Sequence, residues 1–218
     1  MHVGVFDSGI GGEAVAARLR ELLPQAHVVT AHDHPNVPYG SRSEDEVYRL
    51  TKQAIQPLLS ARCAVIVLAC NTATAAAIDR LRVDYPNTAF VGLEPMVKPA
   101  STLSASKTIV VCATPATLLS QRYQRLKRDW TAGITVIEPD CSVWAEIIET
   151  RRADQVDLDP VIRAVQREAA DVVVLACTHY HWIKLQVESA VGSHVTVLEP
   201  SDAIAAQIRR ITSAIRGH

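Results

Sequence analysis

The chain of 218 residues has no long apolar run and no excess of charge of one sign. Its longest apolar stretches, near Ala64–Cys70 and Val172–Cys177, are far shorter than the roughly 20 residues that span a bilayer. The 22 Lys and Arg residues nearly balance the 23 Asp and Glu residues. A basic, nucleic-acid-binding surface is therefore not expected, and the first residues lack the basic segment that opens a signal peptide. We expect a soluble cytoplasmic protein without membrane or nucleic-acid partners.

Cysteine is present, but in a pattern that excludes its usual structural uses. The five residues are odd in number and widely spaced, and no CxxC pair occurs. A disulfide framework or a structural zinc site is therefore not expected, and we predict no bound metal. Cys63, Cys112 and Cys141 are interpreted as small apolar core residues. Polar residues directly follow Cys70 and Cys177, an odd choice for filling a core, so these two thiols are candidates for chemistry.

Short apolar runs rich in β-branched residues alternate with amphipathic stretches such as Glu44–Leu59 and Asp159–Ala169. In the second stretch, Asp159 is the predicted N-cap and Pro160 the first helical residue. This alternation predicts parallel sheets of the α/β class. The predicted strands are Val3–Phe6, Val28–Ala31, Val65–Ala69, Phe90–Leu93, Ile109–Cys112, Thr135–Ile137, Val172–Ala176 and Val195–Leu198. The last amphipathic stretch, Ser201–Arg216, predicts a C-terminal helix.

A weak internal repeat suggests that the chain contains two similar halves. The strand that leads into Cys70 resembles the strand that leads into Cys177, which lies 107 residues later. The same shift carries Asp7, which ends the first strand, to Thr114, just after another predicted strand. We therefore expect two similar doubly wound lobes, each with a parallel four-stranded sheet, related by a pseudo-twofold axis.

The repeat also predicts where a ligand binds. We expect a first lobe over residues 1–97, with residues 205–218 packing back on it, and a second lobe over residues 98–204. In parallel α/β sheets, ligands bind beyond the carboxyl ends of the strands. Cys70 and Cys177 both lie at such ends, so two facing lobes would bring them to one cleft from opposite sides. We expect the active site there.

Paired thiols suit the inversion of a carbon centre. Inversion removes a proton from one face and supplies one to the other, so a two-base site needs one deprotonated and one protonated group. A thiol has a reference pKa of about 8.5, so a modest shift populates the thiolate near neutrality. A Cys/His hydrolase is the rival interpretation, with Cys177 and either His179 or His181. Such sites are usually assembled from distant segments, however, and not from neighbours in sequence.

The glycine-rich segment Asp7–Gly12 follows the first strand and opens a helix. A phosphate loop has this form, but the match to GxGxxG is poor and no Walker lysine is present. Asp7 would repel a phosphate and is better suited to an ammonium group. The backbone N–H groups and Ser8 remain for a carboxylate, so a zwitterionic ligand satisfies both.

Taken together, these segments resemble the glutamate racemases of the aspartate/glutamate racemase superfamily. The matching segments occur in order along nearly the whole chain. They are Val5–Gly12, Val37–Ser43, Ala69–Ala73, Thr114–Thr117 and Leu175–Tyr180, with weaker matches at Gly92–Pro95, Lys98–Ala100 and Cys141–Glu149.

The resemblance implies a role for each matching residue. Cys70 would take the proton from D-glutamate and Cys177 from L-glutamate, with Asp7 and His179 as their auxiliary polar groups. The implied substrate shell is Ser8, Pro38, Tyr39, Gly40, Asn71, Thr72, Thr114, Thr117 and Thr178, with Glu149 as a neighbour. The resemblance also implies a homodimer that needs no cofactor and supplies D-glutamate for peptidoglycan.

Departures from the family pattern keep alternative functions open. The chain is a few tens of residues shorter than typical members, and His181 stands where a proline is usual. Such changes bear on the substrate more than on the chemistry. A racemase for another acidic amino acid such as aspartate, a one-cysteine decarboxylase and a non-catalytic amino-acid-binding relative are the alternatives.

The remaining histidines and tryptophans are given structural interpretations. His32 and His34 flank Asp33, but without a third ligand they are interpreted as solvated loop residues and not as a metal site. The three tryptophans, Trp130, Trp144 and Trp182, are interpreted as core or interface residues.

Overall fold

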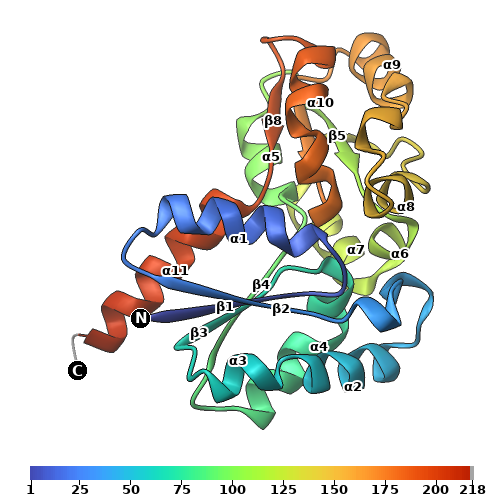
Figure 1. The fold of residues 1–218 in the computed structure, drawn as a ribbon. Helices are drawn as coiled ribbons and strands as arrows, with labels where there is room; N and C mark the ends of the chain where they lie inside the picture. Colours follow the sequence, from blue (N-terminus) through green and yellow to red (C-terminus); the bar gives the residue numbers. More distant parts are fainter. Residues whose placement is uncertain (217–218) are drawn as a thin grey trace. The chain divides into compact units, whose positions relative to one another are not determined.

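The computed structural model describes residues 1–216 and contains two parallel four-stranded sheets (Figure 1). The first sheet has the strand order β2-β1-β3-β4 and the second has the order β6-β5-β7-β8. The strands are β1 (His2–Asp7), β2 (His27–His32), β3 (Val65–Leu68), β4 (Ala89–Gly92), β5 (Thr108–Cys112), β6 (Thr135–Ile137), β7 (Val172–Leu175) and β8 (Thr196–Leu198). The predicted α/β class with two parallel four-stranded sheets is confirmed.

By their contacts, the described residues form two compact units. Unit 1 is Met1–Leu93 together with the chain from Pro200 onward, and unit 2 is Glu94–Glu199. In unit 1, helices cover both faces of the sheet (Figure 1). α1 (Gly11–Leu22) and α11 (Ser201–Arg216) pack on one face, and α2 (Glu44–Ala54), α3 (Gln56–Ser60) and α4 (Asn71–Asp84) pack on the other. The predicted C-terminal helix is confirmed.

Unit 2 repeats this layered arrangement around its own sheet. α5 (Val97–Leu103) and α7 (Gln121–Trp130) pack on one face. The other face is covered by α8 (Trp144–Glu149), α9 (Asp159–Glu168) and α10 (Lys184–Val191). The short helices α6 (Pro115–Leu119) and η4 (Thr178–Ile183) follow β5 and β7 directly. The remaining short helices are η1 (His34–Asn36), η2 (Tyr39–Ser41) and η3 (Ala153–Gln155).

All eight predicted strands are present, each within one residue at either end. The central residues of the inner strands β1, β3, β5 and β7 are almost completely buried, as is typical of parallel strands covered on both faces, whereas those of β2, β6 and β8 are partly exposed. The amphipathic stretch Glu44–Leu59 is helical but not continuous, because the chain breaks at Ile55 between α2 and α3. Pro57 is the physical cause, since it lacks the N–H that a continuous helix would donate to the carbonyl of Gln53.

The predicted N-cap of α9 is wrong by one residue. Asp159 is the first helical residue, and Leu158 occupies the cap position. The carboxylate of Asp157 accepts the N–H of Asp159 at 2.9 Å, so a turn formed before the helix supplies the cap that we expected from Asp159. Pro160 therefore lies at the second helical position.

Strand pairing corrects the repeat by one residue in its first strand. Phe6 pairs with Leu68 in unit 1, and Cys112 pairs with Leu175 in unit 2. Leu175 lies 107 residues after Leu68, but Cys112 lies only 106 after Phe6. The prediction that Asp7 corresponds to Thr114 is therefore wrong. Thr114 is the counterpart of Ser8, and unit 2 has an alanine where unit 1 has Asp7.

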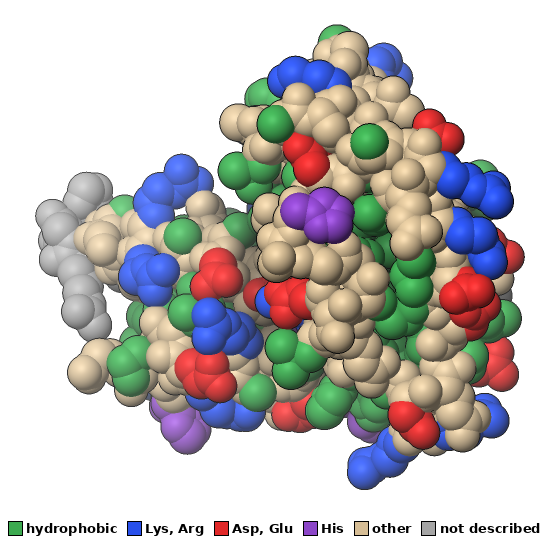
Figure 2. Space-filling model, turned by 90° about the horizontal axis from the view of Figure 1, so that it is seen from above, with side chains coloured by type: hydrophobic (Ala, Val, Ile, Leu, Met, Phe, Trp, Pro, Cys, Tyr) green, Lys and Arg blue, Asp and Glu red, His purple; other side chains and the backbone are tan. Residues whose placement is uncertain are grey.

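The surface carries a mixture of charges. On the face seen in Figure 2, Lys and Arg side chains are interspersed with Asp and Glu side chains. Within residues 1–216, no helix combines the length and apolar character needed to cross a membrane.

Candidate functional site

Cys70 lies between β3 and α4, at the carboxyl edge of the unit 1 sheet. It is the N-cap of the 14-residue helix α4, and its Sγ accepts the N–H of Ala73 at 3.4 Å. The Oγ of Ser8 lies 3.5 Å from the same sulfur. Donors at a helix N-terminus favour the negatively charged form of a sulfur. Because Cys70 is only 7% exposed, this thiol is held in a defined direction.

Asp7 ends β1, and the turn that follows it places Ser8 beside Cys70. Asp7 is almost completely buried, and its Oδ2 accepts the N–H of Gly9 at 3.0 Å. The first turn of α1 approaches Asp7 so closely that a Cβ atom on Gly12 would lie 2.4 Å from the Asp7 Cβ. Glycine at position 12 therefore allows the helix to pack directly on the carboxylate-bearing residue.

Tyr39 lies in the same unit, in a turn whose other predicted site residues, Pro38 and Gly40, are exposed. The Tyr39 hydroxyl donates to Asp33 Oδ2 at 2.6 Å. Burial, the bond to Asp33 and the nearby thiol of Cys70 together raise the pKa of Tyr39 well above its usual value. The phenol therefore stays protonated and acts as a hydrogen-bond donor, not as an acid or base.

Two further predicted residues open α4. Asn71 and Thr72 are its first two helical residues, and both are half-buried. Unit 1 thus brings Asp7, Ser8, Tyr39, Cys70, Asn71 and Thr72 to the carboxyl edge of one sheet or to the turns around it.

Cys177 has a different environment at the matching edge of the unit 2 sheet. It follows β7, is 8% exposed, and its Sγ lies 3.7 Å from Nδ1 of His179. The other ring nitrogen of His179 contacts Glu149, at the end of α8. An ionised carboxylate only accepts, so Nε2 carries a proton and a neutral ring presents bare Nδ1 to the thiol. His179 can therefore take a proton from Cys177 or return one.

Between the two histidines of this segment, His179 and not His181 faces Cys177. The Nδ1 of His181 lies 3.6 Å from a carboxylate oxygen of Glu199, and burial lowers the pKa of His181. The family resemblance names His179 as the auxiliary group of Cys177, and the 3.7 Å distance from its Nδ1 to the sulfur is compatible with that role. The η4 helix begins directly after Cys177, and its first turn brings the His179 ring close to the sulfur.

The threonines predicted for unit 2 lie at its carboxyl edge. Thr114 is the N-cap of α6, and its Oγ1 accepts the N–H of Thr117 at 3.3 Å and donates to the Thr117 hydroxyl at 3.1 Å. Thr178 is buried directly after Cys177. Unit 2 thus gathers hydroxyl groups around strand ends that match those of unit 1.

The other three cysteines have the core role predicted for them. Cys63, Cys112 and Cys141 are buried among apolar side chains. Burial raises the pKa of Cys63, and a hydrogen bond to Cys141 together with burial raises that of Cys112. The thiols of Cys63 and Cys112 therefore resist ionisation.

Sequence reasoning missed three polar residues around the Cys70 side. Asp33 binds Tyr39, and the interpretation of His32 as a solvated loop residue is wrong: it ends β2 and contacts Gly9 and Glu13. His32 and Asp33 could have been selected by the criterion that selected Asp7, since they are polar residues at the carboxyl end of a predicted strand. Among the tryptophans, Trp144 is buried in the core, whereas Trp130 and Trp182 are about half exposed.

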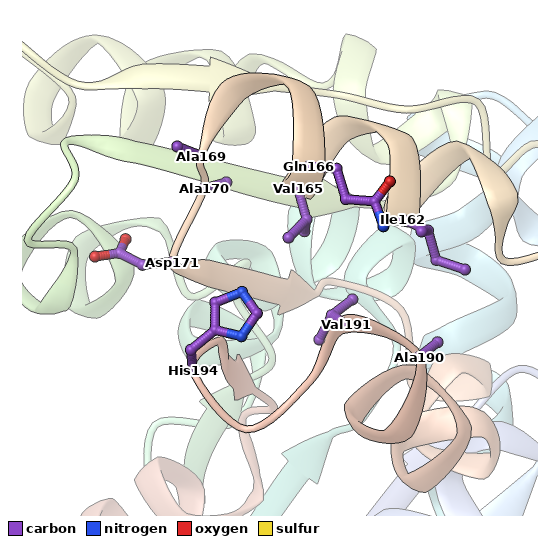
Figure 3. Close-up of a pocket in the computed structure, with 9 residues that line it drawn as sticks. All are labelled: Ile162, Val165, Gln166, Ala169, Ala170, Asp171, Ala190, Val191 and His194. Atoms are coloured by element: carbon purple, nitrogen blue, oxygen red, sulfur yellow. The ribbon is translucent and has the colours of Figure 1, made fainter.

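Within residues 1–216, no group of three or more His, Cys, Asp or Glu residues is arranged so that it could hold a metal ion. A cavity of about 270 Å³ lies between α9 and α10, lined by Val165, Gln166, Asp171 and His194 among others (Figure 3). Asp171 precedes β7, whereas Cys177 follows it. The cavity therefore lies at the opposite edge of the unit 2 sheet from Cys177.

Known proteins resemble this chain in both sequence and fold. A glutamate racemase from Herpetosiphon aurantiacus is 36% identical over 216 residues, covering 97% of this chain and 85% of the relative. The crystal structure of Escherichia coli glutamate racemase in complex with L-glutamate and activator UDP-MurNAc-ala has a TM-score of 0.82. It is 26% identical over 96% of this chain and 81% of that one. Glutamate racemase from Aquifex pyrophilus has a TM-score of 0.74 at 32% identity, over 96% and 83% of the two chains.

The Asp/Glu/Hydantoin racemase family profile matches residues 12–208, which is most of the chain. Sequence relatives and solved structures point the same way, and the resemblance drawn from the ordered motifs is confirmed. The chain belongs to the Asp/Glu/Hydantoin racemase family.

Proposed function

We propose that the protein interconverts L- and D-glutamate without a cofactor, using Cys70 and Cys177 as opposed acid and base. Membership of the racemase family makes the chain an isomerase, and the relatives described above are glutamate racemases. One observation carries the proposal. In each unit, a buried cysteine follows the third strand of the sheet. Each of these thiols has a polar partner within its own unit.

The proposed reaction moves two protons. From D-glutamate, the Cys70 thiolate takes the Cα proton, an S–H bond forms, and the electron pair stays on carbon. The Cys177 thiol then gives its proton to the opposite face of that carbon and becomes a thiolate. The reaction from L-glutamate runs in reverse. Bare Nδ1 of His179 is suited to relay the proton of Cys177, and Glu149 holds the ring in the required tautomer.

The surrounding polar groups suit an amino-acid zwitterion. We assign the ammonium group to the carboxylate of Asp7 in unit 1 and the α-carboxylate to hydroxyl and backbone donors. Those donors come from the substrate shell of Ser8, Asn71, Thr72, Thr114, Thr117 and Thr178, with the turn Pro38-Tyr39-Gly40 beside them. Tyr39 acts through Asp33 as a packing anchor for that turn.

The test is polarimetric or circular-dichroism detection of racemisation with purified protein. We expect L-glutamate and D-glutamate each to approach the racemic mixture, with a much lower kcat/KM for aspartate. Conversion of aspartate in preference to glutamate would show that aspartate is the substrate. Binding of glutamate by calorimetry without racemisation would support a non-catalytic relative, and release of carbon dioxide would support a decarboxylase.

Variants separate the two thiols from the other cysteines. General acid–base groups contribute about 10²- to 10⁴-fold to rate, so Cys70→Ser and Cys177→Ser should each lower kcat/KM at least about a hundredfold. Cys63→Ala is the matched control, because that thiol is also buried but lies before β3, at the opposite edge of the sheet from Cys70. Retention of activity in either serine variant would contradict the two-thiol proposal.

We also propose that the enzyme is a cytoplasmic homodimer that supplies D-glutamate for peptidoglycan. Large apolar side chains that a partner copy could cover include Leu119 and Leu185, which are 81% and 79% exposed. Light scattering after gel filtration should give twice the chain mass of 23.7 kDa. A single-chain mass at micromolar concentration would overturn the dimer.

A further inference from the structure

His32 makes two hydrogen bonds that hold the turn carrying Asp7 and Ser8. It is the last residue of β2, and its side chain is 17% exposed. Its Nδ1 lies 3.1 Å from the carbonyl oxygen of Gly9, and its Nε2 lies 2.7 Å from Oε1 of Glu13. The ring therefore ties the middle of the turn to the first turn of α1.

The partners of His32 determine its proton count. A carbonyl oxygen and an ionised carboxylate oxygen both accept hydrogen bonds and donate none. Both ring nitrogens must then carry protons, because neutral imidazole has only one N–H. With both bonds made, His32 is an imidazolium, and the bond to Glu13 is charge-assisted.

These bonds act on the Cys70 side of the site. The N–H of Gly9 donates to Asp7 Oδ2, while the carbonyl of the same residue accepts from His32. Asp7 and His32 also pair directly across strands β1 and β2. The adjacent residue, Ser8, contacts the Cys70 sulfur. A shift of Gly9 would therefore move both Asp7 and Ser8 relative to the thiol.

We propose that His32, as an imidazolium bonded to Glu13, is a positioning residue for proton transfer at Cys70. This inference rests on the proposed racemase function. The charged or titratable groups around the ring are Asp7 on β1, Glu13 on α1 and His34, whose ring stacks on it at 5.3 Å. A neutral ring has only one N–H, so it could donate only one of the two bonds and would hold the turn less firmly.

Glu13→Gln tests the charge separately from the geometry. A glutamine amide can donate to a neutral ring at Nε2 or accept from a protonated one, so both bonds survive in either protonation state. We expect the ratio of wild-type to E13Q kcat to fall as pH rises. A ratio that is constant with pH would overturn the inference. His34→Gln is the control, since it removes the stacked ring and should keep the wild-type pH profile.

Kinetic isotope effects locate the change on one side of the reaction. Misplacement of a catalytic group by about 1 Å can cost a hundredfold in rate, so we expect His32→Phe to lower kcat about ten- to hundredfold. Deprotonation of D-[2-²H]glutamate is assigned to Cys70, so its isotope effect should rise while that of L-[2-²H]glutamate falls. A purely structural role would lower the active fraction and leave both isotope effects unchanged, which would overturn the proposal.

An activity-free measurement separates this inference from the proposed function. The imidazole ¹⁵N shifts of histidine-labelled protein, with the His32 signal assigned by its loss in His32→Gln, report the ring protons directly. We expect both His32 nitrogens to be protonated at neutral pH in the wild type. A single-tautomer neutral ring there would overturn the imidazolium assignment. Two protonated nitrogens in a protein that racemises nothing would instead refute the function and leave the bond pattern intact.

Discussion

Cys70 and Cys177 occupy matching strand ends but have different neighbours. The Cys70 sulfur contacts a helix N-terminus and Ser8, whereas the Cys177 sulfur contacts the imidazole of His179. The strand register explains part of this difference, because unit 2 has an alanine at the counterpart of Asp7. The auxiliary group of unit 2 therefore comes from the segment after β7.

Glu149→Gln tests the tautomer of His179. A glutamine amide can donate to Nε2 as well as accept from it, so the ring is no longer held with its proton on Nε2 and its acceptor toward Cys177. Loss of the carboxylate partner of a metal-bound histidine costs about 10- to 100-fold, and by analogy we expect kcat to fall by about that much. The isotope effect should rise for L-[2-²H]glutamate and not for the D-isomer. Equal changes with both enantiomers would contradict the assignment of His179 to Cys177.

Asp171 gives a prediction about acid stability. Burial raises the pKa of its carboxyl, but hydrogen bonds from Ser104, Ser106 and the N–H of Ala105 outweigh this and lower the pKa to about 2. In Figure 3 the carboxylate points away from His194, in keeping with these partners. Its contribution is present above about pH 4 and is lost as pH falls toward 2.

Asp171→Asn should therefore lower the free energy of unfolding at pH 7 and matter less in acid. Hydrogen bonds to a charged group are worth about 1.5–3 kcal/mol in general, and solvent screening reduces this to about 1 kcal/mol for a partly exposed carboxylate. Urea unfolding at pH 7 and pH 3 measures the difference. An equal cost at both pH values would show that the charge is not what stabilises this loop.

At the scale of elements, the strands could be predicted because most are short, continuous runs rich in β-branched residues, and the two inner strands of each sheet are buried on both faces. The positions of Cys70 and Cys177 at matching strand ends could be predicted from the repeat of those strands. The break at Ile55 was missed because amphipathic spacing continues through Pro57 while the backbone hydrogen bonds do not. The hydrogen bond between His32 and Gly9 depends on how β1 pairs with β2, which local spacing in the sequence does not encode.

Gly12→Ala tests the close approach of α1 to β1. The added methyl group would lie 2.4 Å from the Asp7 Cβ, so the helix or the aspartate must move. We expect a loss of about 1–3 kcal/mol in the free energy of unfolding. The kcat of the protein that remains folded should also fall about tenfold or more, since about 1 Å of misplacement can cost a hundredfold. Full activity per folded molecule, with the folded fraction measured by circular dichroism, would show that the position of Asp7 is not critical.

At the scale of the whole molecule, the chain builds the same strand order twice. Each unit has its own core on both faces of its sheet, and each carries one of the two thiols at the carboxyl edge. Duplication of this kind would supply the two acid/base groups of the proposed mechanism on separate frameworks. Inversion of a carbon centre requires two such groups, whereas a single-base reaction requires only one.

Early turnover in D₂O tests the two-thiol mechanism most directly. Protium-labelled D-glutamate is converted to a few per cent, and the α-hydrogen of product and of remaining substrate is measured by mass spectrometry. The account predicts product that carries solvent deuterium from the first turnovers and substrate that carries almost none, since a second, solvent-exchanged thiol delivers the new hydrogen. Product that retains the substrate's own α-hydrogen would show a single base acting on both faces and would contradict the account.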